Sequence, residues 1–371
     1  MTPTTQHPAP QPETTQRKWS HTIAKAIKII APLCISAGLV IWLFHKVDIK
    51  QVGTIIREGV DWRFIVAMMV VTILSLMIRG IRWGIQLRAA GIPRIPATAE
   101  CVSIFGAYAL NLVFPYLGEA WRCVYITRRE GCKLSTVVGT DLGDRASDGI
   151  MILALIIFTM SIARPTIDRF LDHYKVGETI AGVWADGMIW VWAGVAIVLI
   201  AGIELLFRHT RFISGINASV KRIWDGFAVL FHMKGTLLYI VLTFGIWTCY
   251  FLKPYLCFYA FPFTREMLVT PAHSWGLLPG LVVFVFGSCS MIVPSNGGLG
   301  PWNLAVMFAL SLYGIGESDA AAYTIVCWSF ESLALVMAGI FSAIYIMVSR
   351  KRLRQSEAND QGQGISATPA R

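Results

Sequence analysis

The sequence predicts an all-α fold, that of a polytopic helical membrane protein. Hydrophobic residues make up 55% of the 371 residues and charged residues only 15%, whereas soluble chains average about 25% charged residues. The mean hydropathy is +0.60, and the apolar residues lie in runs long enough to cross a bilayer. We predict about six full spans and two re-entrant hairpins broken at Gly and Pro, arranged as an inverted repeat.

The net charge and the cysteine and histidine patterns exclude several kinds of partner and site. The net charge of +10 is typical of membrane proteins with basic cytoplasmic loops, so no nucleic-acid partner is predicted. The eight cysteines form no C-x-x-C pair, and the seven histidines form no HExxH motif. We therefore predict no disulfide framework, no metal site and no cofactor.

The first two spans follow from apolar runs with basic flanks. Residues 1–28 are predicted to be a disordered cytoplasmic tail because they begin with a stretch rich in Pro, Thr and Gln. A retained first span is predicted at 29–44, an outside loop at 46–63 and a second span at 64–83. This span ends in a basic cluster without a nearby acid, which we interpret as a cytoplasmic flank: Arg79, Arg82, Arg88 and Arg94.

The next apolar segment, 98–116, is just long enough to cross a membrane but has arginine-rich flanks at both ends. Because both flanks are cytoplasmic in character, we predict a hairpin that enters from the cytoplasm, breaks near 111–118 and returns. The alternative is an ordinary crossing, which would place the two flanks on opposite faces of the membrane.

The middle of the chain alternates spans and connections. Residues 134–145 are predicted to be an amphipathic lead into a span at 149–163, and an outside loop at 164–186 precedes a span at 189–207. A basic cytoplasmic surface helix is predicted at 208–234.

The following span, 236–260, contains Lys253 and Pro254, which we interpret as a kink or the membrane interface. Its far end carries aromatic side chains that suit an interface belt: Tyr250, Phe251, Tyr255, Phe258 and Tyr259.

A second hairpin is predicted in a stretch, Met267 to Ser349, that contains no Lys or Arg. An apolar run at 277–293 meets the sequence PSNGGLGP, and a second run at 304–315 follows. We predict that this hairpin enters from the outside and that a last span follows at 320–348.

Both chain ends are predicted to be cytoplasmic and the protein to lie in the inner (cytoplasmic) membrane. Basic residues after the last span favour this orientation: Arg350, Lys351, Arg352 and Arg354. Residues 350–371 are predicted to be a disordered tail, which leaves 29–349 as one integral membrane domain.

Charged residues near the first break are the first candidates for a site. Glu119 and Arg122 lie three apart, on one face of a helix that begins after the break, and form either a local ion pair or substrate contacts. A stripe at helical spacing follows, either a solvated face or the polar lining of a cavity: Asp141, Asp144, Arg145 and Asp148. We favour the lining role for Asp148 because an apolar span follows it directly.

The second break offers backbone groups. Asn111 and Asn296 lie beside the two breaks, where an amide can satisfy either broken backbone groups or a ligand. A helix starting after Pro301 would direct its N-terminal dipole toward the glycines before it, which favours an anion such as phosphate or carboxylate: Gly297, Gly298 and Gly300. Glu331 is the one carboxylate within the last span. It is either a functional residue that faces the interior of the helix bundle or the partner in a buried structural hydrogen bond.

Several residues recur in this order: Asn111, Pro115, Gly118, Glu119, Arg122, Gly139, Thr140, Arg145, Asp148, Pro294, Gly297, Gly298 and Gly300. This set, within about residues 30 to 350, resembles the lysylphosphatidylglycerol synthetase transmembrane-region family, also called flippase-like integral membrane proteins. The resemblance implies a bacterial or archaeal membrane protein that moves a lipid or lipid-linked headgroup between leaflets. Departures from the family pattern bear on headgroup preference: Asn303 and Asp144 in place of Glu, and Tyr116 and Leu117 where a basic residue is common.

Three functions are consistent with these observations. The first is a flippase-like transporter of a membrane lipid or lipid-linked substrate, without catalytic residues; no synthetase activity is expected, because only a short polar tail follows the membrane region. The second is a membrane-embedded glycosyl- or phosphotransferase that uses Asp144 and Asp148 on a lipid phosphate. The third is a scaffold for a partner synthase.

Overall fold

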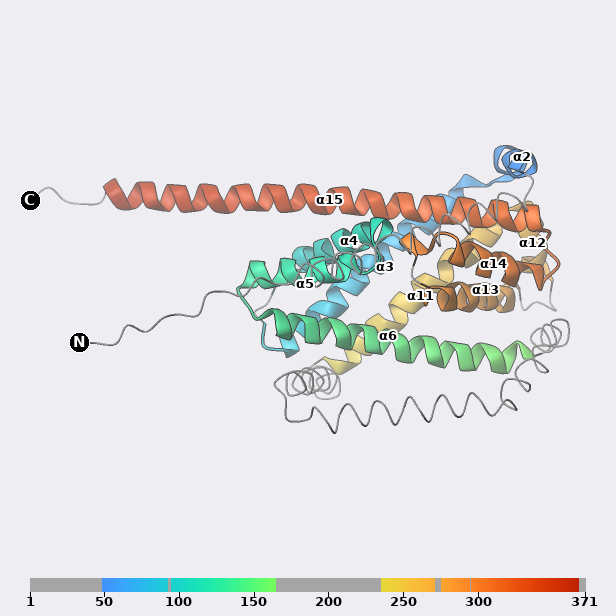
Figure 1. Cartoon of the computed structure of the whole chain (residues 1–371), viewed down its shortest axis with the longest axis horizontal. Helices are drawn as coiled ribbons and strands as arrows, with labels where there is room; N and C mark the ends of the chain where they lie inside the picture. Colours follow the sequence, from blue (N-terminus) through green and yellow to red (C-terminus); the bar gives the residue numbers. More distant parts are fainter. Residues whose placement is uncertain (1–48, 93–94, 165–234, 271–274, 294, 367–371) are drawn as a thin grey trace, which may run out of the picture.

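The computed structural model describes residues 49–92, 95–164, 235–270, 275–293 and 295–366. These residues form helices and turns, with no strand among them (Figure 1). The first span, the span at 189–207 and the surface helix after it lie outside the described residues.

Four long apolar helices form the frame of the molecule: α3 (Trp62–Ala89), α6 (Leu134–Ile162), α11 (Thr236–Ala260) and α15 (Glu317–Ser366). Each contains a stretch long and apolar enough to cross a membrane, which confirms four of the predicted spans. The chain is therefore a polytopic helical membrane protein. Within α15 the apolar part is Glu317–Ser349, and the helix continues to Ser366 through most of the segment predicted as a tail.

Local sequence explains where α3 begins and why the polar stripe belongs to α6. The carboxylate of Asp61 accepts a hydrogen bond of 3.2 Å from the N–H of Arg63 and so caps α3. The predicted amphipathic lead at 134–145 and the span at 149–163 are not separate elements, because α6 continues through both. The polar stripe therefore lies on the first half of a spanning helix.

Most of the connection predicted at 46–63 is helical rather than an irregular loop, because Ile49–Gly59 forms the helix α2. Its apolar residues fall on one face, and Val52 packs there against Ala321 and Ala322 of α15. This short amphipathic helix covers the beginning of α15 at one end of the molecule (Figure 1).

Both predicted breaks separate two short helices. The first hairpin consists of α4 (Ala97–Val113) and α5 (Leu117–Glu130), and the second of α13 (Leu277–Ser290), the 3₁₀ turn η2 (Asn296–Gly298) and α14 (Pro301–Ser311). The four α-helices have 17, 14, 14 and 11 residues, or about 16–26 Å at 1.5 Å per residue. Each is shorter than the ~30 Å hydrocarbon core, so the helix–break–helix prediction is confirmed for both segments.

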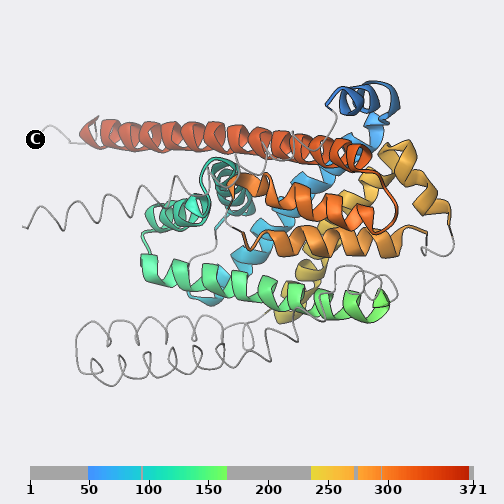
Figure 2. The same cartoon turned by 45° about the vertical axis from the view of Figure 1, so that its right-hand side comes forward.

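Two hydrophobic clusters show at which end of the molecule each hairpin begins and ends. The first cluster joins the end of α3, the end of α5 and the start of α6, with Leu87, Ile126 and Val137. The second joins the start of α3, the ends of α6 and α14 and the start of α15, and includes the short helix α12 (Pro262–Val269). The hairpins therefore enter from opposite ends, as predicted, and their breaks meet in the middle (Figures 1 and 2).

The hairpins are held in place by contacts with each other and with α15. A Cβ atom added to Gly297, at the second break, would lie 2.6 Å from the side chain of Leu112 in α4. The hydroxyl of Ser342 in α15 donates a 2.8 Å hydrogen bond to the carbonyl of Val102 in α4. The longest helix, α15, thus packs along the first hairpin. The tip of the second hairpin contacts the tip of the first.

This arrangement predicts the sidedness of three exposed positions. Cysteines introduced at Arg88 and Arg129 should be labelled by a membrane-impermeant maleimide from the same face, because α3 and α5 end in one cluster. A cysteine at Arg57, in α2 at the other end, should be labelled from the opposite face. We expect the arginine-rich face to be cytoplasmic. Labelling of Arg88→Cys and Arg129→Cys from opposite faces would contradict the hairpin.

Candidate functional site

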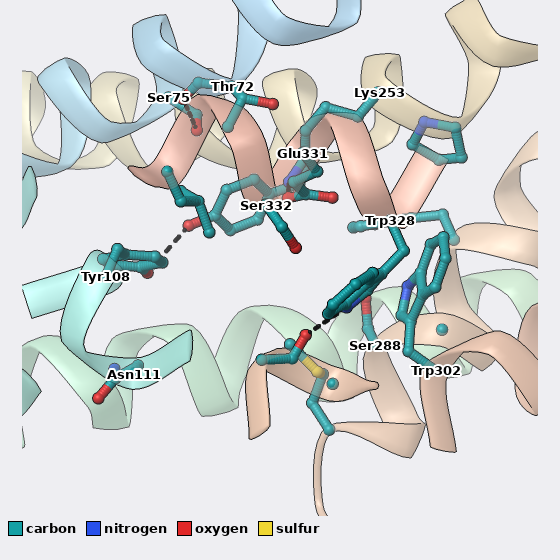
Figure 3. A pocket seen from close by; sticks show the side chains of 18 of the residues that line it. Thr72, Ser75, Tyr108, Asn111, Lys253, Ser288, Trp302, Trp328, Glu331 and Ser332 are labelled. Carbon is teal, nitrogen blue, oxygen red and sulfur yellow. Dashed lines mark hydrogen bonds and ion pairs between the residues drawn. The ribbon is translucent and has the colours of Figure 1, made fainter. Parts of the chain in front are cut away.

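A cavity of about 480 Å³ lies where the two hairpin breaks meet, walled by residues of α3, α6, α11 and α15. Apolar side chains such as Leu76 and Phe284 form part of its wall, and polar side chains from several elements point into it (Figure 3). Charged residues also line it: Arg79, Glu119, Arg145, Asp148, Lys253 and Glu331.

Two arginines of α3 and two aspartates of α6 form a closed ring of ion pairs beside the cavity. Arg79 donates to Asp144 at 3.1 Å and to Asp148 at 2.7 Å, and Arg82 donates to the same residues at 2.6 and 2.8 Å. Each oxygen of the two carboxylates accepts one of these bonds. Asp148 reaches the cavity, whereas Arg82 and Asp144 are fully buried.

The prediction that Arg79 and Arg82 form a cytoplasmic flank is wrong. Both side chains are buried, at 2% and 0% exposed. Their acids come from α6, far along the chain, so the sequence around Arg82 contains no partner. The available signal was spacing: the arginines lie three apart and Asp144 and Asp148 four apart, so each pair occupies one helix face.

A further ion pair extends the ring toward the first hairpin. Arg122 of α5 pairs with Asp141 and lies 3.7 Å from a carboxylate oxygen of Asp144. Its guanidinium also stacks over Trp83, 4.5 Å from the ring centroid. Arg122 is buried and lies outside the cavity lining, so this pair supports the charged wall from behind.

The break of the first hairpin brings Asn111, Glu119 and Arg145 together. Pro115 cannot continue α4, and the carbonyl oxygen of the Asn111 side chain accepts a 2.8 Å bond from the N–H of Gly118 at the start of α5. The amide nitrogen of Asn111 donates to both oxygens of Glu119 at 3.1 Å. Arg145 of α6 donates to Glu119 at 2.5 Å. The side chain of Asn111 therefore hydrogen-bonds both the backbone N–H of Gly118 and the carboxylate of Glu119.

The break of the second hairpin presents backbone to the cavity. Gly297 and Gly298 have φ angles of 57° and 79° and line the cavity, and Trp328 of α15 donates to the carbonyl of Gly297 at 2.8 Å. Asn303 lies behind this turn, where its side chain accepts a 3.1 Å bond from the N–H of Gly300 at the start of α14. In this chain Asn303 thus caps a helix.

Lys253 and Glu331 form an ion pair on the remaining wall, between α11 and α15. Both partners line the cavity, so Lys253 is not an interface residue, and α11 continues as a helix through Pro254. The predicted aromatic belt is also wrong for Tyr250 and Phe258. Tyr250 lines the cavity and accepts a 3.2 Å bond from Arg79, and Phe258 is buried in the core.

The structure thus divides the predicted site residues into two groups. One group lines the cavity: Asn111, Glu119, Arg145, Asp148, Gly297, Gly298 and Glu331. The other lies behind it or beside its breaks: Arg122, Asp141, Asp144, Asn296, Gly300 and Asn303. Sequence reasoning missed other lining residues: Arg79, Tyr108, Tyr250, Lys253, Trp302 and Trp328.

The arrangement is an electrically balanced wall inside an apolar frame. In the clusters of α3, α5 and α6, the formal charges of four arginines and four carboxylates cancel. Such pairs lower the cost of charges within a bilayer, and those that reach the cavity can exchange partners with a charged ligand.

The carboxylates of this wall are engaged by arginine. Within the residues that the structure describes, no three His, Cys, Asp or Glu side chains gather at distances suited to a metal ion. Asp144 and Asp148, the acids of the transferase alternative, accept arginine hydrogen bonds at both oxygens.

Comparison with known proteins supports the resemblance noted in the sequence. The family model described as "Lysylphosphatidylglycerol synthase TM region" matches residues 29–339. No curated protein and no solved structure matches the chain. Since the family model covers most of the 371 residues, the chain belongs to the lysylphosphatidylglycerol synthase TM region family.

Proposed function

We propose that this protein moves the headgroup of a lipid or lipid-linked intermediate between the two leaflets while the lipid tails stay in the bilayer. The observation that carries the proposal is the cavity at the meeting point of two hairpins that enter from opposite ends, with six charged side chains in a mostly apolar wall. A headgroup held there is midway along the molecule. The family is linked to lipid modification or flipping, which agrees with this role.

Ion-pair exchange is the mechanism that we infer for headgroup binding. The Arg145–Glu119 pair is the most accessible of the pairs on α6, with side chains 38% and 20% exposed. A headgroup phosphate can replace Glu119 on Arg145, and a headgroup amine can replace Arg145 on Glu119. Because Asn111 still holds Glu119 by two hydrogen bonds, that carboxylate keeps a partner when Arg145 turns to the ligand.

The proposed function involves no chemical step. In the transferase alternative, Asp144 and Asp148 must contact the lipid phosphate, yet Asp144 is fully buried and both acids bind two arginines. A ligand at the cavity wall reaches Arg145 and Glu119 first. We propose a membrane lipid as the partner and the inner membrane as the location, with both termini cytoplasmic.

Reconstitution tests the transport proposal. Purified protein in liposomes with a nitrobenzoxadiazole-labelled lipid should make the inner-leaflet label accessible to dithionite, without any change in the chemical identity of the lipid. The Arg145→Gln variant should lower the initial rate by about tenfold, the effect of losing a contact of about 1.4 kcal/mol.

The matched control is Arg129→Gln, which removes a surface arginine at the end of α5 that pairs with Glu130. This variant should scramble at the wild-type rate. A wild-type protein that leaves the label inaccessible, or that releases a modified lipid, would refute the transport proposal. An Arg145→Gln variant that scrambles at the wild-type rate would remove Arg145 from the site.

A further inference from the structure

The Lys253–Glu331 pair stands apart from the arginine clusters. Lys253 is the one Lys, Arg, Asp or Glu in the α11 sequence, and Glu331 is the one such residue between Asp319 and Arg350. Two otherwise uncharged stretches thus each bring one charge to the same wall of the cavity (Figure 3). A charged side chain near the centre of a spanning helix costs about 2.5–3.5 kcal/mol, so this pair requires a specific reason.

Helix packing does not supply that reason. One residue after Lys253, the carbonyl of Pro254 accepts a 2.7 Å hydrogen bond from the hydroxyl of Tyr323 in α15. This neutral bond already joins α11 to α15 beside Lys253, about two turns before Glu331 on α15. Apolar side chains of similar size often hold helices as well as a buried ion pair does.

The surroundings of Lys253 suit an exchangeable anion. Its ammonium has three N–H donors, and the hydrogen bond to Glu331 uses one of them. The ammonium also lies 4.8 Å from the ring centroid of Tyr250, whose hydroxyl is held by Arg79. The Lys253 and Glu331 side chains are 15% and 30% exposed, so a ligand in the cavity can reach both. Arg79, by contrast, is held by Asp144, Asp148 and Tyr250 together.

We propose that Lys253 is a binding site for the phosphodiester of a lipid headgroup, and that Glu331 occupies this site when no lipid is bound. The inference rests on the proposed transport function and specifies the headgroup chemistry. On binding, a phosphate oxygen takes the place of a Glu331 oxygen on the ammonium. Trp328, one helical turn before Glu331 and fixed by its bond to Gly297, provides an aromatic wall beside the exchanged pair (Figure 3).

Binding measurements on three purified proteins test this exchange: wild type, Glu331→Gln, and the double variant Lys253→Met with Glu331→Gln. The probe is dihexanoyl phosphatidylglycerol, and binding is followed by the shift in thermal unfolding midpoint and by tryptophan fluorescence. Glu331→Gln removes the competing carboxylate and should bind the probe about tenfold more tightly, a gain of about 1.4 kcal/mol. The double variant should keep the wild-type unfolding midpoint without ligand and bind about tenfold more weakly than wild type.

Two further ligands identify the source of the phosphate. Dihexanoylglycerol, which has the tails without phosphate, should not distinguish the three proteins. Inorganic phosphate should compete only weakly, and binding as tight as that of the lipid would assign the site to a free anion and overturn the proposal. Equal probe binding by wild type and the double variant, or weaker binding by Glu331→Gln, would also overturn it.

These outcomes separate this inference from the transport proposal. Loss of the folded state in the double variant, without a gain in affinity in Glu331→Gln, would assign the pair to helix packing and refute the phosphate site. Wild-type protein that binds the probe through Lys253 but does not scramble lipid would refute transport while leaving the phosphate site in place.

Discussion

Replacing Asp144 with alanine is expected to destabilise the folded protein by about 3–5 kcal/mol, the cost of removing one partner from a buried ion pair. Asp144 is fully buried and accepts hydrogen bonds from Arg79 and Arg82, and Arg122 lies 3.7 Å away. The substitution leaves three buried guanidinium groups to share Asp141 and Asp148. The unfolding midpoint in detergent, followed by circular dichroism and size-exclusion chromatography, measures the loss.

The control for this prediction is Glu130→Gln. Glu130 pairs with Arg129 at 3.1 Å, and the Arg129 side chain is 29% exposed, against 2% and 0% for Arg79 and Arg82, so the pair is closer to solvent than the ring of α3 and α6. Its loss should cost less than about 1 kcal/mol. Equal midpoints for Asp144→Ala and the wild type would show that the ring does not stabilise the fold.

Gly118→Ala is expected to be the most damaging small substitution in the hairpins. A Cβ atom at Gly118 would lie 2.0 Å from the carbonyl oxygen of Ala107 and 2.8 Å from the side-chain oxygen of Asn111. Since backbone cannot yield as a flexible side chain does, α4 and α5 must separate, at a cost of about 1–3 kcal/mol or more. The same shift moves Asn111 and Glu119 at the cavity, so both the unfolding midpoint and lipid scrambling should fall.

The control for Gly118→Ala is a glycine-to-alanine substitution at a helical position with free space around it. Gly53, in α2, has no atom within 4 Å of an added Cβ, and alanine in a helix is more favourable than glycine by about 1 kcal/mol. Gly53→Ala should therefore leave stability unchanged or raise it. A Gly118→Ala variant as stable as Gly53→Ala would contradict the close packing of the first hairpin.

The frame and the hairpins could be predicted from the sequence because they follow from local patterns. The limits of α11 coincide with the apolar run at 236–260, and Pro115 and the glycines before Pro301 lie at the two breaks. The opposite entry of the hairpins followed from the arginine-rich flanks of one and the absence of Lys and Arg from the other. These features depend on composition within one or two helical turns.

The charged wall was only partly predicted because its partners are distant in sequence. Asp148 and Glu119 were assigned to a site from their unusual positions beside apolar runs, whereas Arg79 and Arg82 were interpreted as a flank. Helical spacing places Arg79 and Arg82 on one face of α3, but only the packing of α6 shows that this face is buried. Lys253 was missed for the same reason, since its partner Glu331 lies 78 residues away. Helix α2 was predicted as a loop because its apolar face has meaning only against α15.

The ring between α3 and α6 also has a consequence for biogenesis. Asp144 lies 65 positions after Arg79, and a ribosome adds about 5–20 residues per second, so the arginines emerge several seconds before their partners. Until then α3 carries two unneutralised cations that lipid disfavours. We therefore expect stable insertion of α3 to depend on the arrival of α6, so that the two helices settle in the membrane together rather than in order of synthesis.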